Sequence, residues 1–385
     1  MTAGDGGSGS PGPSALGAVL ARAGQALASG LARGWPAGNG AEVDPRLGLE
    51  SWDAVADGRH NSNTDMILWR DQLLLVHDAR PYHLGTPESR LVVRSSKDGH
   101  RFETLASLQV AGKDIRDPKL AVIGGRLHLY ALPNSGTYAV PECTVLATSD
   151  DAVRWSSFEP VDPPGWLFWR PKTRDGSTWY VSAYWHRHGE SVLLRSNDGR
   201  GWTKVSTIHR GDANDETEIE FLPDGRLLAT ARLEIDADSL VGHFDACTAI
   251  AVAEPPYETW TEHRSRVTRL DGPVLFSHAG TVYAVARYQP EPRGFLTRLG
   301  SALARKRTSI FRVEPDRLVR LSDLPSAGDT SYAGAVMRDG ELFVDYYTSR
   351  IDRDYPWLLG MFLPTDIRMA RIPLDALAAL SAATP

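Results

Sequence analysis

Three glutamates and one arginine stand close together near the middle of the chain. The glutamates alternate with other residues, at Glu216, Glu218 and Glu220. In a β-strand, alternate side chains point to one face. The residues Pro223-Asp224-Gly225 are typical of a tight turn, and the apolar stretch after it ends on Arg232. We therefore predict a hairpin whose two ends meet at one edge, where carboxylates could exchange protons and a guanidinium could bind an anion.

Similar hairpins recur along the chain. Each begins with polar residues, continues as an apolar strand, turns at Gly, Asp or Asn, and returns as a second apolar strand. The copies begin near residues 65, 117, 169, 215, 271 and 329. A spacing of about 45 to 60 residues is typical of four-stranded propeller blades. The predicted fold class is therefore all-β, a six-bladed β-propeller of four-stranded antiparallel blades.

A second repeat follows three of these hairpins. It reads Ser-Lys-Asp-Gly from Ser96, Ser-Asp-Asp-Ala from Ser149 and Ser-Asn-Asp-Gly from Ser196, each closed by an aromatic residue. Ser and Asp side chains in such turns bind nearby backbone groups. The repeat resembles the Asp-box, also called the BNR repeat. We expect these turns on the face of the propeller opposite the functional site.

The two ends of the chain differ from its middle. Residues 1–45 are expected to form a disordered or weakly helical extension, 46–373 the propeller, and 374–385 a tail. Met1 to Ser14 is rich in Gly, Ser and Pro, and residues 1 to about 42 are expected to be dispensable for folding. The last blade is one strand short, so we expect Leu47 to Val55 to complete it. Such closure leaves no open sheet edge.

Composition excludes some partners. The chain of 385 residues carries a net charge of −6, which argues against a nucleic-acid partner. No stretch reaches the ~18–20 apolar residues of a membrane span. The N-terminal region is a poor signal peptide, so we expect a cytoplasmic protein, and a monomer. His186 and His188 share a strand face but have no third ligand in sight, so neither a metal nor a cofactor is expected.

Propeller geometry brings the candidate residues together. Inner strands start on one face of a propeller, and second strands end there. That face therefore collects the carboxylates Asp65, Asp117 and Glu216, the tyrosine Tyr332, and the arginines Arg116, Arg170, Arg232 and Arg287. Aromatic residues of the loops lie on the same face. Carboxylates, arginines and aromatics around one axis suit a polar, ring-shaped ligand, so the expected partner is a carbohydrate substrate.

At these motifs the chain resembles the sialidase (neuraminidase) superfamily of six-bladed propellers. The resemblance covers residues 50 to 372 and is most specific over Glu-Thr-Glu-Ile-Glu-Phe-Leu-Pro-Asp-Gly-Arg-Leu-Leu-Ala-Thr-Ala-Arg. It implies that Glu216 activates the nucleophile and that Arg232 binds the substrate carboxylate. Asp-Thr-Ser-Tyr-Ala-Gly-Ala-Val resembles the family segment that carries the nucleophile, which implies that role for Tyr332. Arg287 is a looser match to another arginine of the family's site, and Arg307 competes with it for that role.

The resemblance implies a retaining glycoside hydrolase similar to exo-α-sialidases. A sialoside carries a carboxylate on its anomeric carbon, which would repel a carboxylate nucleophile. A neutral phenol avoids this repulsion, and sialidases are the tyrosine exception among retaining glycosidases. A separate acid must protonate the leaving oxygen. By position, Asp65, Glu88 and Asp117 all qualify for this role.

The chain departs from the family in its first blade. The family has an arginine motif there, whereas this chain has Asn63-Thr64-Asp65-Met66-Ile67, and the nearest match is Arg116 in the next blade. Two alternatives to the sialidase-like function therefore remain open. One is a glycosidase of neutral or furanose sugars that uses a carboxylate pair drawn from Asp65, Asp117 and Glu216. The other is a non-catalytic glycan-binding propeller.

Overall fold

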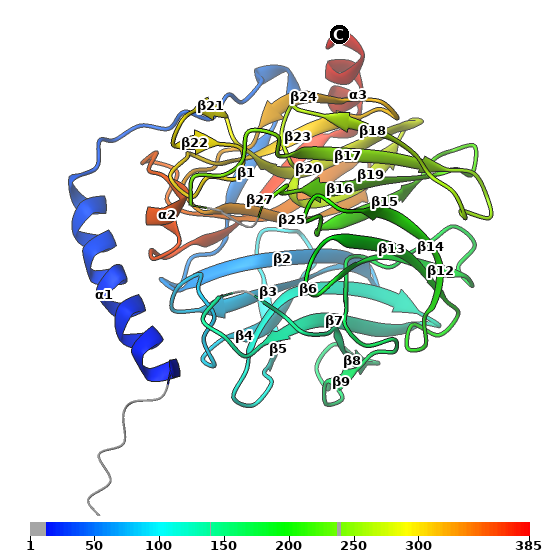
Figure 1. The fold of residues 1–385 in the computed structure, drawn as a ribbon, viewed down its shortest axis with the longest axis horizontal. Helices are drawn as coiled ribbons and strands as arrows, with labels where there is room; N and C mark the ends of the chain where they lie inside the picture. Colours follow the sequence, from blue (N-terminus) through cyan, green and yellow to red (C-terminus); the bar gives the residue numbers. More distant parts are fainter. Residues whose placement is uncertain (1–12, 139, 237–239) are drawn as a thin grey trace, which may run out of the picture.

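The computed structural model describes residues 13–138, 140–236 and 240–385. Six four-stranded antiparallel sheets are arranged around a common axis, which confirms the predicted six-bladed propeller (Figure 1). The sheet of the third blade gains a short fifth strand. In five blades the inner strand is followed outward by its sequence neighbours, and in the sixth the outer strand comes from the N-terminal segment. The continuous apolar stretches that predicted the hairpins therefore correspond to strands that are buried on both faces.

In the first three blades the strands follow their sequence order from the axis outward. The first blade consists of β2 (His60–Trp69), β3 (Gln72–Arg80), β4 (Arg90–Ser96) and β5 (Glu103–Leu108). The second consists of β6 (Asp114–Ile123), β7 (Arg126–Asn134), β8 (Val145–Ser149) and β9 (Glu159–Pro160). The third consists of β10 (Trp166–Phe168), β12 (Trp179–Trp185), β13 (Glu190–Ser196) and β14 (Thr203–Arg210), with β11 (Lys172–Thr173) also paired to β12.

The fourth and fifth blades have the same arrangement, whereas the sixth takes its outer strand from the N-terminal segment. The fourth consists of β15 (Thr217–Phe221), β16 (Leu227–Leu233), β17 (Cys247–Ala253) and β18 (Thr261–Ser265). The fifth consists of β19 (Asp271–His278), β20 (Thr281–Tyr288), β23 (Arg307–Val313) and β24 (Leu318–Asp323), and a small hairpin of β21 (Arg293–Gly294) and β22 (Thr297–Arg298) lies in its loop. The sixth consists of β25 (Thr330–Arg338), β26 (Glu341–Thr348), β27 (Asp366–Pro373) and β1 (Glu50–Val55).

The ring is closed by the N-terminal strand. β1 pairs antiparallel with β27, with Trp52 opposite Met369, and so supplies the outer strand of the sixth blade. This confirms the expectation that the segment ending at Val55 completes the last blade, although the strand begins at Glu50 rather than Leu47. Apolar side chains fill the spaces between blades, and a buried cluster joins Leu74 of the first blade to Leu129 of the second.

Each of the three Ser/Asp repeats forms a compact turn. At Ser96 the hydroxyl accepts a hydrogen bond from the Gly99 amide at 2.9 Å, and Asp98 accepts from the amide of His100 at 2.8 Å. Ser149 and Ser196 hold the same arrangement. These side chains satisfy backbone groups that a sharp turn would otherwise leave unpaired.

The N-terminal helix α1 (Pro13–Gly34) packs against the propeller beside the short helix α2 (Trp357–Gly360), as Figure 1 shows at the left. Ala28 is 3% exposed and belongs to a cluster with Tyr355 and Leu363. The Gln25 side-chain amide also donates to the carbonyl of Pro81 at 3.0 Å. These contacts argue against the expectation that the extension contributes nothing to stability.

The two ends of the chain lie outside the regular blades. The predicted disorder of Met1 to Ser14 falls mostly on residues 1–12, which lie outside the described residues, while Pro13 and Ser14 begin α1. A short 3₁₀ helix, η1 (Pro45–Leu47), precedes β1. The chain ends in helix α3 (Leu374–Ala383), which packs on η1. Among the described residues, no helix has the length and apolar character needed to cross a membrane.

Candidate active site

Four inner strands carry the same irregularity near their start. Each pairs with its second strand in regular register except for one β-bulge. The first bulged residue has a left-handed backbone in every case, with φ of 43° at Asn63, 51° at Asp117, 61° at Gly272 and 47° at Tyr332. Left-handed backbone is uncommon outside glycine and tends to gather at functional sites. The bulge directs these four residues toward one end of the propeller axis.

A cavity of about 230 Å³ opens at that end of the axis. Most of its lining is polar, and residues of all six blades contribute to it. The lining residues are Asn63, His83, Arg116, Asp117, Pro141, Tyr184, His188, Asp215, Glu216, Arg232, Glu234, Arg269, Arg287, Tyr332 and Trp357. Charged groups therefore converge on the cavity, and aromatic side chains form only a small part of its wall. This composition suits a small polar ligand.

Tyr332 and Glu216 meet inside this cavity. The phenol hydroxyl of Tyr332 donates a hydrogen bond to one oxygen of the Glu216 carboxylate, although the residues come from the sixth and fourth blades. The other carboxylate oxygen accepts from the Gly272 amide at 2.7 Å and lies 2.9 Å from Nη1 of Arg232. Both oxygens of Glu216 are thus held in place, and one of them is directed at the phenol.

Burial shapes the protonation of this pair. It raises the pKa of Glu216 above the ordinary glutamate value, although Arg232 opposes the shift. Burial, together with the charge of Glu216, raises the pKa of Tyr332 well above the ordinary tyrosine value. A phenol with a raised pKa is neutral at neutral pH. It becomes a nucleophile only if a base takes its proton during attack, and Glu216 is in place to do so.

Asp117 is the third titratable group of the cavity that the sequence analysis named. One carboxylate oxygen accepts a hydrogen bond from the Asn63 side-chain amide at 2.7 Å, so two of the bulge residues contact each other. Burial raises the pKa of Asp117, with Lys119 and Arg116 opposing the shift. A carboxyl with a raised pKa can hold a proton at higher pH than an exposed one.

Three of the expected arginines line the cavity. Arg232 is bound by Asp215, with Nε 2.6 Å from Oδ1, as well as by Glu216. Arg287 donates to the Tyr347 hydroxyl at 2.7 Å and to the Thr330 carbonyl at 2.8 Å. The guanidinium of the third, Arg116, is held from behind by Asp114, 2.8 Å from Nε. Each guanidinium is therefore fixed in orientation by groups outside or beside the cavity.

Arg170 and Asp65, which the sequence analysis also assigned to the site, lie outside the described lining of the cavity. Arg170 is 6% exposed and donates to Asp65 at 2.7 Å and to Glu218 at 2.8 Å. It also bonds the backbone carbonyls of Pro273 and Ala333 in the fifth and sixth blades. Its guanidinium therefore ties blades together across the axis. Glu88, the other acid considered, is an exposed loop residue that is absent from the lining.

Besides His83, Pro141 and Tyr184 of the lining, three further residues of the site were not predicted from the sequence. Glu234 lies 3.4 Å from Arg232, and Arg269 lies 2.6 Å from Asp271 and 3.2 Å from Glu234. Both lie just beyond strand ends, where no repeat pattern marks them. The third is Gly272, because a Cβ built there would overlap the Tyr332 ring. Its place directly before Pro273, matching Asp117 before Pro118, is the signal that could have found it.

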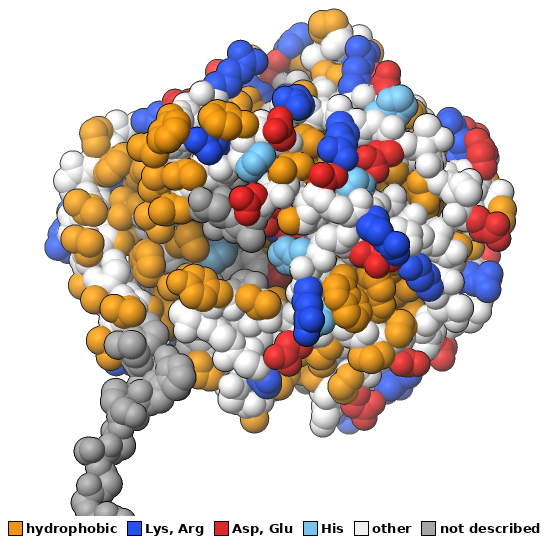
Figure 2. Space-filling model, in the orientation of Figure 1, with side chains coloured by type: hydrophobic (Ala, Val, Ile, Leu, Met, Phe, Trp, Pro, Cys, Tyr) orange, Lys and Arg blue, Asp and Glu red, His pale blue; other side chains and the backbone are white. Residues whose placement is uncertain are grey.

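Two groups of possible metal ligands border the cavity. One consists of His188, Asp215 and Glu234, and the other of His60, His83 and Asp329. In the first group the carboxylates are already bound by Arg232 and Arg269. In the second group, one carboxylate oxygen of Asp329 faces both histidines. Figure 2 shows histidine side chains at the edge of the hollow on the visible face.

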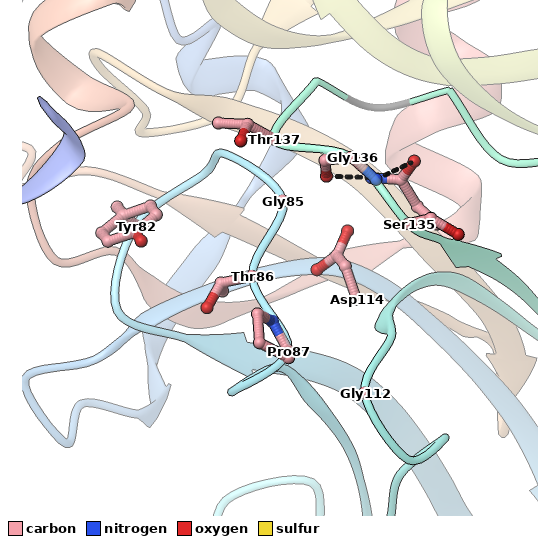
Figure 3. A pocket seen from close by; sticks show the side chains of 10 residues that line it. Tyr82, Gly85, Thr86, Pro87, Gly112, Asp114, Ser135, Gly136 and Thr137 are labelled. Carbon is pink, nitrogen blue, oxygen red and sulfur yellow. Dashed lines mark hydrogen bonds between the residues drawn. The ribbon is translucent and has the colours of Figure 1, made fainter. Parts of the chain in front are cut away.

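A smaller hollow of about 160 Å³ lies beside the cavity, between the loop of Gly85, Thr86 and Pro87 and the segment Ser135–Thr137. Figure 3 shows the Asp114 side chain pointing into it. The Asp114 carboxylate also forms an ion pair with Arg116, so it lies between the smaller hollow and the axial cavity that Arg116 lines. Burial alone would raise its pKa, but Arg116 and Arg80 outweigh burial and lower it to about 2. Asp114 is therefore an anion that fixes Arg116.

Comparisons with known proteins concern the fold. No model of a known protein family matches the chain, and no curated protein sequence matches it significantly. Among solved structures, a Trypanosoma rangeli sialidase mutant with trans-sialidase activity superposes with a TM-score of 0.63 and 13% identity over 89% of this chain. The fold is that of a sialidase-like propeller.

Other solved structures superpose on the chain at similar identity. The endosialidase of phage phi92 superposes with a TM-score of 0.59 and 11% identity, covering 85% of this chain and 69% of that one. An α-L-arabinofuranosidase of Fusarium graminearum has a TM-score of 0.56 and 12% identity, covering 88% of this chain and 98% of that one. The present chain spans 61% of the trypanosomal protein. At these identities the likeness establishes the fold alone.

Proposed function

We propose that the protein is a retaining glycoside hydrolase of sialidase type, with Tyr332 as the nucleophile and Glu216 as its base. The observation that carries the proposal is the hydrogen bond from the Tyr332 hydroxyl to Glu216 inside the axial cavity. A nucleophile and base in direct contact, with the base itself oriented by a third group, is the arrangement that covalent catalysis requires. Here Arg232 and the Gly272 amide orient the base.

The reaction would proceed in two steps. In the first, the Tyr332 oxygen attacks the anomeric carbon as its proton passes to Glu216, and the bond to the leaving oxygen breaks. In the second, water attacks the same carbon and releases Tyr332, which takes its proton back from Glu216. Two displacements at one carbon retain its configuration.

Asp117 is the best-placed acid for the leaving group. Of the three acids considered, it alone lines the cavity among the described residues. Burial raises its pKa, which favours the protonated form that a general acid needs. In the second step its carboxylate would take the proton of the attacking water.

A tyrosine nucleophile implies a substrate with negative charge beside the anomeric carbon. The phenol is neutral before attack, so it approaches such a carbon without repulsion. Arg232, Arg287 and Arg116 line the same cavity and could bind a carboxylate. The substrate class proposed is therefore a sialoside or a related sugar acid. Similarity of the fold to sialidases is consistent with this choice.

A carboxylate-pair glycosidase is the second candidate, and one observation favours it. The first-blade bulge carries Asn63, which binds Asp117 instead of offering a guanidinium to an anion. Asp117 and Glu216 could then serve a neutral or furanose sugar, with no role for the phenol. The structural likeness to an arabinofuranosidase is compatible with that substrate class.

A covalent label separates the two candidates. Purified protein would first be tested on fluorogenic sialosides, arabinofuranosides and fructofuranosides. It would then be incubated with a fluorinated sialosyl fluoride, digested and analysed by mass spectrometry. The proposal expects turnover of the sialoside and a label on the peptide that contains Tyr332. A label on a carboxylate, turnover of neutral sugars only, or no turnover in the whole panel would refute it.

A further inference from the structure

We propose that His60, His83 and Asp329 bind a divalent transition-metal ion, with Zn²⁺ as the test ion, at the wall of the axial cavity. His60 opens β2 in the first blade, His83 lies in the loop after β3, and Asp329 directly precedes β25 in the sixth blade. Their three ligand atoms lie within 4.8 Å of one another. The ligand set therefore comes from three separate segments that the closed ring brings together.

The ligand atoms have separations close to those of a metal site. Nε2 of His60 lies 3.3 Å from Oδ2 of Asp329, and Nδ1 of His83 lies 2.7 Å from the same oxygen. Zn²⁺ binds nitrogen and oxygen ligands at about 2.0–2.2 Å, which places tetrahedral ligands roughly 3.3 Å apart. The separation of His60 from Asp329 already fits, and the separation of His83 from the same oxygen must widen from 2.7 Å to about 3.3 Å. The two histidine nitrogens lie within 4.8 Å of each other, so a rotation of the His83 ring can complete the set.

The orientation of His60 is the strongest argument. Its Nδ1 lies 2.8 Å from the Leu363 carbonyl, which can only accept, so Nδ1 carries a proton. In a neutral imidazole ring the other nitrogen, Nε2, then carries a lone pair and no proton. That lone pair faces a carboxylate oxygen, is fully buried, and has no hydrogen-bond partner among the described residues. Oδ2 of Asp329 already pairs with Nδ1 of His83 at 2.7 Å, so two imidazole nitrogens converge on one buried carboxylate oxygen. A cation among these three atoms, either a proton on Nε2 or a metal ion, would satisfy the buried Nε2, and the convergence of three ligand atoms favours the metal ion.

Each ligand is also supported by a second contact, as metal ligands usually are. The Leu363 carbonyl fixes the His60 ring. The other oxygen of Asp329, Oδ1, accepts from Nε1 of Trp357 at 2.7 Å and from the Tyr347 hydroxyl at 3.0 Å. These donors leave Oδ2 directed at the histidines. The backbone of His83 is held by the Met361 carbonyl at 2.8 Å.

The ligand types point to a class of metal. Two imidazoles and one carboxylate suit Zn²⁺ and other first-row divalent ions, whereas Ca²⁺ and Mg²⁺ prefer oxygen ligands. Three protein ligands leave a fourth position for water or a ligand atom. Because His83 and Trp357 line the cavity, an ion at this site would lie at its wall. The proposal concerns metal binding and does not depend on the proposed hydrolase activity.

The test measures binding directly. Tag-free, chelator-treated full-length protein would be titrated with Zn²⁺ by calorimetry, and its metal content measured after gel filtration. The proposal expects one ion per chain and a rise in melting temperature with Zn²⁺. Loss of a residue that merely supports a ligand weakens metal sites about 10- to 100-fold, so removal of a direct ligand in His83→Ala should weaken binding at least about tenfold. His60→Ala and Asp329→Asn should do the same.

A matched variant distinguishes this site from the other candidate group. His188→Ala removes the histidine beside Asp215 and Glu234 and should leave Zn²⁺ binding unchanged. Circular dichroism and the melting temperature without metal identify variants that fail to fold, and the partly exposed His83 is the safest substitution. Absence of stoichiometric binding in the wild-type protein would overturn the proposal, as would binding that survives His83→Ala in a folded protein or is lost only with His188→Ala.

Discussion

The Tyr332 hydroxyl binds Glu216 across the fifth blade, and the residue that separates them in the ring is a glycine. Gly272 belongs to the intervening blade, and its amide donates to Glu216 while the Tyr332 ring lies where a side chain would stand. The contact therefore depends on three consecutive blades. A tyrosine and a glutamate that are 116 residues apart in the sequence become neighbours because the blade between them presents only backbone.

Tyr332→Phe should abolish catalysis without unfolding the protein. The ring keeps its contact with Trp169, at 6.1 Å between ring centroids, and loses only the hydroxyl. We expect kcat to fall by at least about 10³-fold because the nucleophile is missing. The melting temperature should change by no more than a few degrees. Tyr184→Phe, in the same cavity, should lose far less activity, and equal losses in the two variants would contradict the nucleophile role.

Gly272→Ala should displace Tyr332. The added Cβ overlaps the phenol ring, and the positive φ of 61° adds strain of about 1–2 kcal/mol. Gly280→Ala, in the turn of the same blade, has a φ of 80° and no neighbour within 4 Å. Gly272→Ala should therefore lose more stability in chemical denaturation than Gly280→Ala, which carries the backbone strain without the overlap, and only Gly272→Ala should lose activity. A fully active Gly272→Ala protein would mean that the position of Tyr332 does not matter.

The pH dependence of kcat/KM should be bell-shaped. Glu216 must be ionised to act as a base, so activity rises with pH through its pKa. Asp117 must be protonated to act as an acid, so activity falls with pH through its own pKa. Burial raises both pKa values, so both limbs should lie at higher pH than for exposed carboxyl groups, whose ordinary pKa is about 4.

Asp117→Asn tests the assignment of the second limb. The amide cannot lose its proton in this pH range, so the fall in activity at high pH should disappear. Activity on poor alkyl leaving groups should drop by about 10²–10⁴-fold, whereas aryl glycosides with good leaving groups should lose less. An unchanged pH profile would assign the acid role to another residue.

Arg170→Met should destabilise the propeller instead of weakening substrate binding. It leaves Asp65 and Glu218 as buried charges without their guanidinium partner. Breaking a buried ion pair from one side costs about 3–5 kcal/mol. The exposed Arg195→Met in the same blade should change the free energy of unfolding by less than about 0.5 kcal/mol. Denaturant titration measures both, and a raised KM with normal stability would place Arg170 in the binding site after all.

Ala28→Asp should detach helix α1. The carboxylate would enter the apolar contact with Tyr355 and Leu363, where it has no partner among the residues described there. We expect a fall of a few degrees in melting temperature and faster proteolysis between α1 and β1. The neighbouring Leu27 is 66% exposed, so Leu27→Asp should have little effect on either. Equal behaviour of the two variants would support a dispensable extension.

The architecture was predictable because propeller hairpins repeat with strand periodicity. Six turns, each between two apolar strands, define six blades. The last blade is one strand short, so the N-terminal segment must supply that strand. The proximity of Tyr332 and Glu216 followed from the same geometry, since both begin inner strands. These features depend on patterns within each blade, which a single sequence displays.

The sequence did not predict in the same way how far along the propeller axis each candidate side chain lies. Asp65 and Tyr332 both lie near inner-strand starts, but Asp65 is the first residue after its bulge, two positions past Asn63, whereas Tyr332 is the first bulged residue. Asp65 accepts a hydrogen bond from the Leu120 amide at 2.7 Å and does not line the cavity. Arg170 occupies a break between β10 and β11, from which it reaches four other blades. The inner strands of all six blades pack together around the axis, and this packing decides which side chains occupy it. The local sequence of one strand carries little information on such packing.

The recurrent bulge has a consequence for how such a site can change over evolutionary time. Asn63, Asp117, Gly272 and Tyr332 occupy equivalent positions, yet they include an amide, a carboxylate, a bare backbone and a phenol. The backbone that presents each of them is supplied by its own blade. A substitution at one position can therefore alter the reactivity of the cavity while leaving the neighbouring blades intact. The propeller is therefore a modular scaffold in which each of these blades sets the chemical group at its own position in the cavity.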